Sequence, residues 1–173
     1  MGTLAAQLLL TSWNASGERL EQRCAGLTDE EYLWRPVADA WTLKPDPDRA
    51  GQWTYDYEFA PPPPAPVTSI SWRIVHLIGD NEIYWEYAFG EGNRTFPDLE
   101  VPPQAQRALE LWRASREPIT TWLGEATDED LAELRPSHLG KDQPAGEVVR
   151  ILLDEQTHHG AEIALLRDLY LRQ

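Results

Sequence analysis

The stretch Asp154-Glu155-Gln156-Thr157-His158-His159-Gly160-Ala161-Glu162 lies inside the C-terminal run from Pro144 to Gln173. At about 100° per residue, its titratable groups continue an apolar helical stripe that spans an arc of roughly 80°. The members of this stripe are Val148, Leu152, Glu155, His159, Glu162 and Leu166. Leucines at both ends of the arc indicate that this face packs against a core. The run therefore predicts one long amphipathic helix with polar groups on its buried face.

A carboxylate and an imidazole on a buried helix face need partners. Glu155 and His159 are four residues apart, so their side chains project together and can hold a divalent metal. Two other interpretations stay open at this point. The two groups could form a hydrogen-bonded buried pair, or the helix could be rotated so that they meet water.

The composition indicates one domain of 173 residues with an ordinary hydrophobic content of 42%. Its formal net charge of −14 repels phosphate backbones and anionic membrane surfaces, so we expect no nucleic-acid or membrane partner. Cys24 is the only cysteine, which rules out an internal disulfide and fits a reducing compartment. No signal peptide or membrane span is evident, and we expect a cytoplasmic protein.

Three more long helices are predicted upstream, and they cover about 3–26, 69–89 and 104–124. Thr68 or Ser69 caps the second of these, and Pro118 predicts a kink or an early break in the third. Thr28 and Thr127 each open a short helix as part of a capping box, closed by Glu31 and Asp130. Four amphipathic helices without a set of strands predict an all-α four-helix bundle.

Residues 35–67 show no sustained periodicity and are rich in proline. Within them, the aromatic run 53–59 alternates, and it could pair as a short ribbon or simply lie over the bundle. A loop of this length in a compact domain is usually a functional flap or disordered. Because its aromatic residues favour packing, we expect a lid over one end of the domain.

The second predicted helix carries His76 on the same face as Trp72, Asp80 and Ile83. An imidazole between a tryptophan and an isoleucine is expected to be buried or nearly so. We expect Asp80 to orient the ring by accepting a hydrogen bond from its second nitrogen. His138 lies in a loop beside Ser137 and Gly140, and we assign it no function.

Three motifs together resemble the DinB-like superfamily over roughly residues 5–170. They are Trp34-Arg35-Pro36, the run from Ser69 to Ile78 around His76, and His158-His159-Gly160-Ala161-Glu162-Ile163. The resemblance implies an up-down-down-up four-helix bundle with a divalent metal at one end of its interior. It also implies three histidine ligands, one on the second helix and an H-x-x-x-H pair on the last.

On this sequence the implied ligand positions fall on His76, Glu155 and His159, so a glutamate stands where the pattern expects a histidine. Two histidines and a glutamate are an accepted set for catalytic zinc, and the carboxylate also suits nickel or manganese. The same departure is compatible with a site that has lost its metal. We expect Asp80 and Glu162 to accept hydrogen bonds from the ligands or to act as a general base, and a solvated or structural role is the alternative for each. We expect His158 to support or flank the ligands rather than to bind the metal.

The resemblance further implies a thiol-dependent S-transferase or isomerase that acts on a small electrophilic molecule, with a low-molecular-weight thiol as co-substrate. The alternative is a non-catalytic, stress-related binding or scaffold bundle whose His/Glu cluster is structural. The eight tryptophans mainly indicate broad packing surfaces, and a homodimer is compatible with either function.

Overall fold

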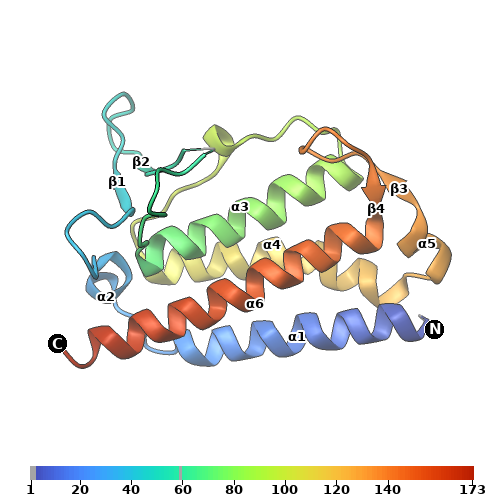
Figure 1. Cartoon of the computed structure of the whole chain (residues 1–173), viewed down its shortest axis with the longest axis horizontal. Coiled ribbons are helices and arrows are strands. Elements are labelled where there is room, and N and C mark those ends of the chain that lie inside the picture. The colour runs from blue at the N-terminus through green and yellow to red at the C-terminus, as the bar shows by residue number, and fades with distance from the viewer. Residues whose placement is uncertain (1–2, 59) are drawn as a thin grey trace.

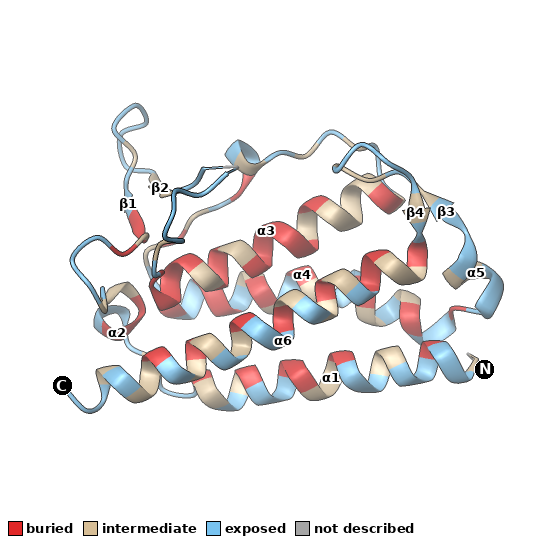
Figure 2. Cartoon of the chain, viewed as in Figure 1, coloured by how far each residue is buried: buried red, intermediate tan, exposed pale blue. Residues whose placement is uncertain are grey.

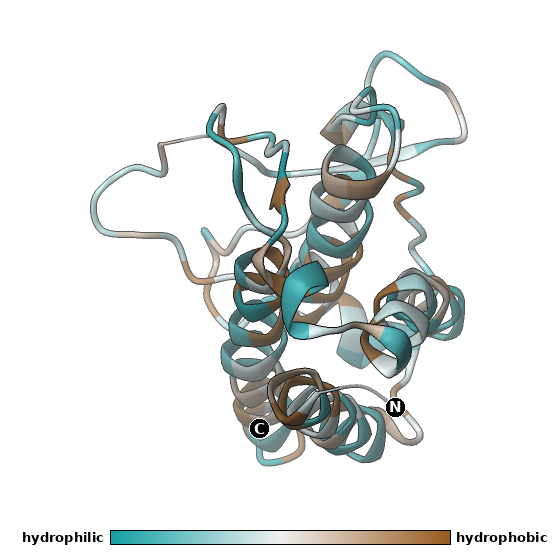
Figure 3. Ribbon diagram, turned by 90° about the vertical axis from the view of Figure 1, so that its right-hand side faces the viewer, coloured by the Kyte–Doolittle hydropathy of each residue, from teal (hydrophilic) through white to brown (hydrophobic). Residues whose placement is uncertain are grey.

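Four long α-helices make up most of the computed structural model, which describes residues 3–58 and 60–173. They are α1 (Leu4–Cys24), α3 (Ile70–Phe89), α4 (Ala105–Glu125) and α6 (Ala145–Tyr170). Figure 1 shows these helices side by side, with α1 and α6 running in one direction and α3 and α4 in the other. Seen end-on in Figure 3, they group around a common centre. The expected, mostly helical fold is confirmed.

Shorter elements connect the long helices. They are α2 (Asp29–Leu33), β1 (Leu43–Pro45), β2 (Trp53–Tyr55), the 3₁₀ helix η1 (Phe96–Asp98), α5 (Asp128–Ala132), β3 (Leu134–Arg135) and β4 (Gln143–Pro144). β1 pairs antiparallel with β2, in line with the ribbon alternative for 53–59, and β3 pairs antiparallel with β4, which the sequence did not predict. In the described part of the chain, no helix combines the length and apolar character that a membrane crossing needs.

Local capping signals explain where several helices begin. The side chain of Ser69 accepts a hydrogen bond from the backbone N–H of Trp72, so Ser69 rather than Thr68 is the cap of α3. Thr127 and Asp130 form the predicted reciprocal capping box at α5. Thr28 caps α2 as expected, because its side chain accepts a hydrogen bond from the backbone N–H of Glu31. The other half of the predicted capping box, in which the Glu31 side chain accepts from the backbone N–H of Thr28, is wrong. Glu31 is buried and its Oε1 accepts from Arg167 Nε at 2.8 Å, because this charged partner on α6 competes successfully for it.

Of the two alternatives predicted at Pro118, the early break is wrong, since α4 continues through it to Glu125, and the kink stays a prediction. A proline removes one N–H and leaves the carbonyl four residues earlier without its helical partner. Ala114, which carries that carbonyl, lines the same open surface groove as Pro118, so water can serve the carbonyl.

The core consists of two apolar clusters. One is centred on Leu20, Ile74, Trp112 and Ile163, and the other on Trp13, Ile119, Leu123 and Leu152. Figure 2 shows the buried positions on the facing sides of the long helices. Buried polar residues from all four helices lie among these apolar groups, namely Ser16, Asn81, Ser115 and Gln156.

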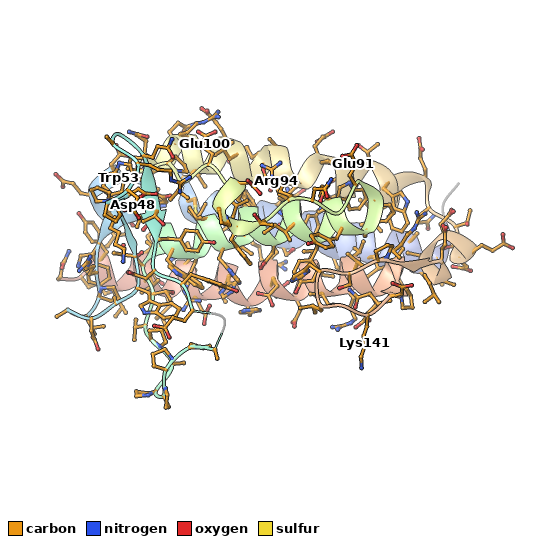
Figure 4. All side chains as sticks on the ribbon, turned by 90° about the horizontal axis from the view of Figure 1, so that it is seen from above. Asp48, Trp53, Glu91, Arg94, Glu100 and Lys141 are labelled. Carbon is orange, nitrogen blue, oxygen red and sulfur yellow. The ribbon has the colours of Figure 1, made fainter. Side chains whose placement is uncertain are left out.

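The segment 35–67 packs against the start of α3 and contains the β1–β2 hairpin. Trp41 forms backbone hydrogen bonds of 2.9 Å with both Val67 and Ser69, which closes the base of the segment. Trp53 pairs with Pro45 and Tyr55 with Leu43, so residues 53–55 form a ribbon, which was one of the two alternatives predicted. Phe59 lies outside the described residues. From above, Figure 4 places Asp48 and Trp53 at one end of the molecule and Lys141 toward the other.

Candidate metal centre

Two helices bring together the three side chains for which the sequence predicted metal binding. His76 comes from α3, and Glu155 and His159 come from successive turns of α6. Glu155 Oε2 lies 3.2 Å from His159 Nε2 and 3.5 Å from His76 Nε2. One potential ligand atom from each residue lies within 4.8 Å of the other two. The chain therefore contains a His/Glu cluster that could bind a metal.

The ring of His159 is held from its other side. Its Nδ1 lies 2.7 Å from Glu162 Oε2 and also 2.7 Å from Arg73 Nη1. Arginine can only donate and a carboxylate can only accept, so Nδ1 serves one of the two. Because Arg73 already donates to Glu162, the arrangement favours donation from His159 Nδ1–H to that same oxygen. This leaves the lone pair of Nε2 facing Glu155, as metal ligation requires.

The ring of His76 is positioned differently from the prediction. It stacks on Trp72 with ring centroids 4.9 Å apart, and its Nδ1 is buried without a hydrogen-bond partner in the described part of the chain. Asp80 Oδ2 lies 3.1 Å from Nε2, the nitrogen that also faces Glu155. The expectation that Asp80 accepts from the second nitrogen is therefore wrong. The i, i+4 spacing on α3 brings Asp80 to the same side of the ring as α6.

The remaining predicted side chains lie at the edge of the cluster. His158 is largely exposed, and its Nδ1 lies 2.8 Å from the backbone oxygen of Asp154. Its Nε2 is 3.5 Å from Glu155 Oε2, which places it beside the cluster. Glu162 is about half exposed, so the predicted buried stripe of α6 is interrupted there. His138 contacts Tyr84, with ring centroids 4.1 Å apart, and takes no part in the cluster.

Burial and charge act in opposite directions on these groups. Burial lowers the pKa of His76, but Asp80 and Glu155 outweigh it and leave the pKa above its usual value. For His159 burial dominates and the pKa is lowered. Burial raises the pKa of Asp80 to about 6. Burial also opposes ionisation of Glu155, yet contacts with His159 and His76 hold its pKa well below the usual range. Glu155 is therefore a ready anionic ligand.

His76 lies in the second turn of α3, whereas Glu155 and His159 lie around the middle of α6. The location of a metal at one end of the bundle stays a prediction. The segment 35–67 reaches its border through Trp72, whose Nε1 donates to the backbone oxygen of Asp56 at 2.6 Å. The side chain of His76 is 18% exposed and that of Glu155 27%, so neither residue is completely closed off from solvent.

Two residues that shape the cluster escaped the sequence analysis. Arg73 is one turn before His76 on α3, a spacing that places it on the same helix face. Gln156 is fully buried on the other side of α6, where its Nε2 donates to Ser16 Oγ at 2.6 Å and to Trp13 O at 3.1 Å. Gln156 thereby fixes the rotation of α6 that presents Glu155 and His159 to α3. A glutamine next to a charged stripe carries no distinctive signal of burial.

Comparisons with known proteins agree with this fold. A DinB-like protein from Bacillus cereus aligns with a TM-score of 0.63 at 17% identity, covering 94% of this chain and 90% of that one. A conserved protein from Enterococcus faecalis aligns with a TM-score of 0.61 at 13% identity, covering 100% and 99%. No curated protein matches the chain. The sequence model of the DinB superfamily matches residues 47–163, which include all three clustered residues. The chain belongs to the DinB superfamily.

Proposed function

We propose that the chain binds a divalent metal ion through His76, Glu155 and His159 and uses it to act on a small molecule. The observation that supports this most directly is the spacing of the three ligand atoms. Donors bound to one zinc at about 2.0–2.1 Å in a tetrahedron lie roughly 3.3–3.5 Å apart. Glu155 Oε2 meets this spacing with both histidines, at 3.2 and 3.5 Å.

The donor set suits Zn²⁺, Ni²⁺ or Mn²⁺, because it combines two imidazoles with one carboxylate. When bound, such an ion supplies Lewis acidity and lowers the pKa of a thiol or water. The chain's own residues have supporting roles. Glu162 and Arg73 fix the ring of His159, and Trp72 supports the ring of His76. The segment 35–67, tethered through Trp72, serves as a lid that limits the access of water.

The finer activity that we propose is a thiol-dependent S-transferase or isomerase reaction on a small electrophile, with a low-molecular-weight thiol as co-substrate. Membership of the DinB superfamily supports this reaction class, and the acidic chain disfavours nucleic acid as a substrate. The proposal includes a single up-down-down-up four-helix bundle over residues 1–173. A cytoplasmic location and a homodimer stay predictions.

Metal binding is tested by titrating protein without a polyhistidine tag with Zn²⁺, Ni²⁺ and Mn²⁺ after treatment with a chelator. We expect one ion per chain for the wild type and a loss of affinity of about 100-fold or more in Glu155→Gln. Glu117→Gln is the matched control, because Glu117 is an exposed glutamate of α4 outside the cluster, and we expect its affinity to equal that of the wild type. A wild-type protein that takes up none of the three ions contradicts the proposal.

The alternative of a non-catalytic scaffold is favoured by one observation, the mutual contacts of Glu155 with the two histidines, which partly satisfy the polar groups. The metal-loaded protein is therefore assayed for conjugation of a cysteine-derived thiol to an electrophilic aryl halide. The enzyme proposal expects turnover that Glu155→Gln abolishes. Metal binding without turnover over a panel of thiols and electrophiles favours the scaffold.

A further inference from the structure

Asp80 is a buried carboxylate that the proposed ligand set leaves unexplained. It lies on α3 with 5% of its surface exposed, and its Oδ2 forms no hydrogen bond in the described part of the chain. The nearest charged neighbour is His76, whose Nε2 is 3.1 Å from this oxygen but is not aligned as a hydrogen-bond donor to it. A carboxylate in this environment needs a cation or several donors to offset its desolvation.

Few cations are available to Asp80. The imidazoles of His76 and His158 act on it, and each also lies 3.5 Å from Glu155 Oε2. Arg73 already pairs with Glu162. The charge of Asp80 also acts on Tyr55 and Tyr84, but a phenol supplies at most one hydrogen bond and no charge. Within the described residues Asp80 ion-pairs with His76 alone, and Glu155 faces the same nitrogen, so the two carboxylates bring two negative charges to one imidazole. A divalent cation balances this charge.

We propose that Asp80 is a fourth ligand of the ion held by His76, Glu155 and His159, an inference that rests on the proposed function. The nitrogen that Asp80 faces is the metal-facing nitrogen of His76, so Asp80 cannot act as the orienting group behind that ring. Asp80 lies outside the group of three whose ligand atoms are within 4.8 Å of one another. A shared ion would have to draw the two carboxylates together, and no hydrogen bond from the described residues holds Asp80 Oδ2 in its present place.

The fourth ligand defines the kind of ion that the site takes. Two carboxylates and two imidazoles form a harder donor set than three imidazoles, and harder sets suit Mn²⁺ better. Four protein ligands also close a tetrahedral site. A substrate can then bind only if the ion accepts five or six ligands, which Mn²⁺ and Co²⁺ do readily.

The test compares Asp80→Asn with the wild type and with Asp154→Asn. Asp154 is an exposed carboxylate on α6 next to Glu155, so it is a matched control for the same change in charge. Chelator-treated proteins are titrated with Co²⁺, Mn²⁺ and Zn²⁺ in competition with a chromophoric chelator. The visible spectrum of the Co²⁺ form and the unfolding temperature without added metal are recorded.

We expect Asp80→Asn to lose about 100-fold or more in Mn²⁺ affinity, less in Zn²⁺ affinity, and to change the Co²⁺ spectrum. Its unfolding temperature without metal should be unchanged or higher, because the variant no longer buries an unpaired charge. A merely structural role predicts the opposite, a lower unfolding temperature with unchanged affinity. Asp154→Asn should match the wild type in all three measurements.

Wild-type affinity and an unchanged Co²⁺ spectrum in Asp80→Asn overturn the fourth ligand while leaving the proposed function standing. A wild type that binds none of the three ions overturns the proposed function itself. If Asp80→Asn does not fold, Asp80→Ser, which is smaller and neutral, provides the same comparison.

Discussion

Gly17 offers a sharp test of the packing that orients α6. It lies on α1 directly over the guanidinium of Arg116 from α4, and a Cβ built at Gly17 would overlap the end of that side chain. Arg116 Nε donates to Gln156 Oε1 at 2.7 Å, and its Nη2 donates to Trp13 O at 3.0 Å. The guanidinium also lies over the rings of Trp13 and Trp112, 4.9 and 5.0 Å from their centroids.

The size of the effect of Gly17→Ala follows from these contacts. Alanine in a helix is better than glycine by about 0.5–1 kcal/mol. We assume that a displaced Arg116 loses about half of the stabilisation from its two charge-assisted hydrogen bonds and its two cation–π contacts. This loss costs about 2–4 kcal/mol. The net expectation is a free energy of unfolding lower by about 1–3 kcal/mol, which corresponds to roughly 2–12 °C in Tm.

Urea unfolding followed by tryptophan fluorescence measures this difference, and Gly124→Ala is the matched control. Gly124 lies near the end of α4. Apart from its own helix backbone and chain neighbours, no atom of residues 3–58 and 60–173 lies within 4 Å of the position that an added Cβ would take. The same substitution there should raise stability by up to about 1 kcal/mol. If Gly17→Ala is as stable as Gly124→Ala, displacing Arg116 does not lower the free energy of unfolding. The contacts of Arg116 with Gln156, Trp13 and Trp112 then do not contribute the stability estimated above.

Three further predictions concern the site and its border. Glu162→Ala should lower metal affinity by about 10–100-fold, and Glu162→Gln, which keeps an acceptor for His159, should lower it less; equal affinities in a competition titration would contradict the orienting role. Trp72→Phe removes the hydrogen bond to Asp56, so amide exchange in residues 41–58 should accelerate about fivefold by mass spectrometry, and unchanged exchange would show that the tether is dispensable. Burial raises the pKa of Cys24 from 9.0 to about 12, so at pH 8 its thiolate fraction is about 1000-fold smaller; labelling by an aromatic disulfide should wait for unfolding, and fast labelling of the folded chain would refute this.

Sequence reasoning succeeded where the controlling interaction is local. Ser69 and the Thr127–Asp130 pair form their hydrogen bonds within one helical turn, so their residue types alone predict the helix starts. The i, i+4 spacing of Glu155 and His159 fixes their shared direction in the same way. Long apolar stripes likewise predict α1, α4 and α6 to within a few residues at their ends.

The wrong predictions concern features that depend on contacts with residues far away in the sequence. Glu31 leaves its capping box because Arg167 of α6 reaches it, and no pattern in α2 predicts that contact. The β3–β4 pairing of two residues each is too short to leave an alternating signal. Which nitrogen of His76 faces Asp80 depends on how the His76 ring is rotated where it stacks on Trp72. The sequence pattern does not predict this rotation, because side-chain packing determines it.

The glutamate at position 155 is better understood together with Asp80 than as an isolated departure from a three-histidine pattern. Three histidines hold a divalent ion without neutralising it, and they tolerate burial without any ion because each can be neutral. Glu155 and Asp80 instead place two carboxylates beside two imidazoles, while the ion pair of Arg73 with Glu162 is neutral by itself. Asp80 is the costly member, because burial opposes its ionisation, whereas the two histidines favour the ionised form of Glu155. Chelation should therefore lower the stability of the wild type more than that of a variant carrying both Asp80→Asn and Glu155→Gln. If chelation lowers the unfolding temperature of the wild type and of the double variant equally, the two carboxylates are stabilised by the protein alone.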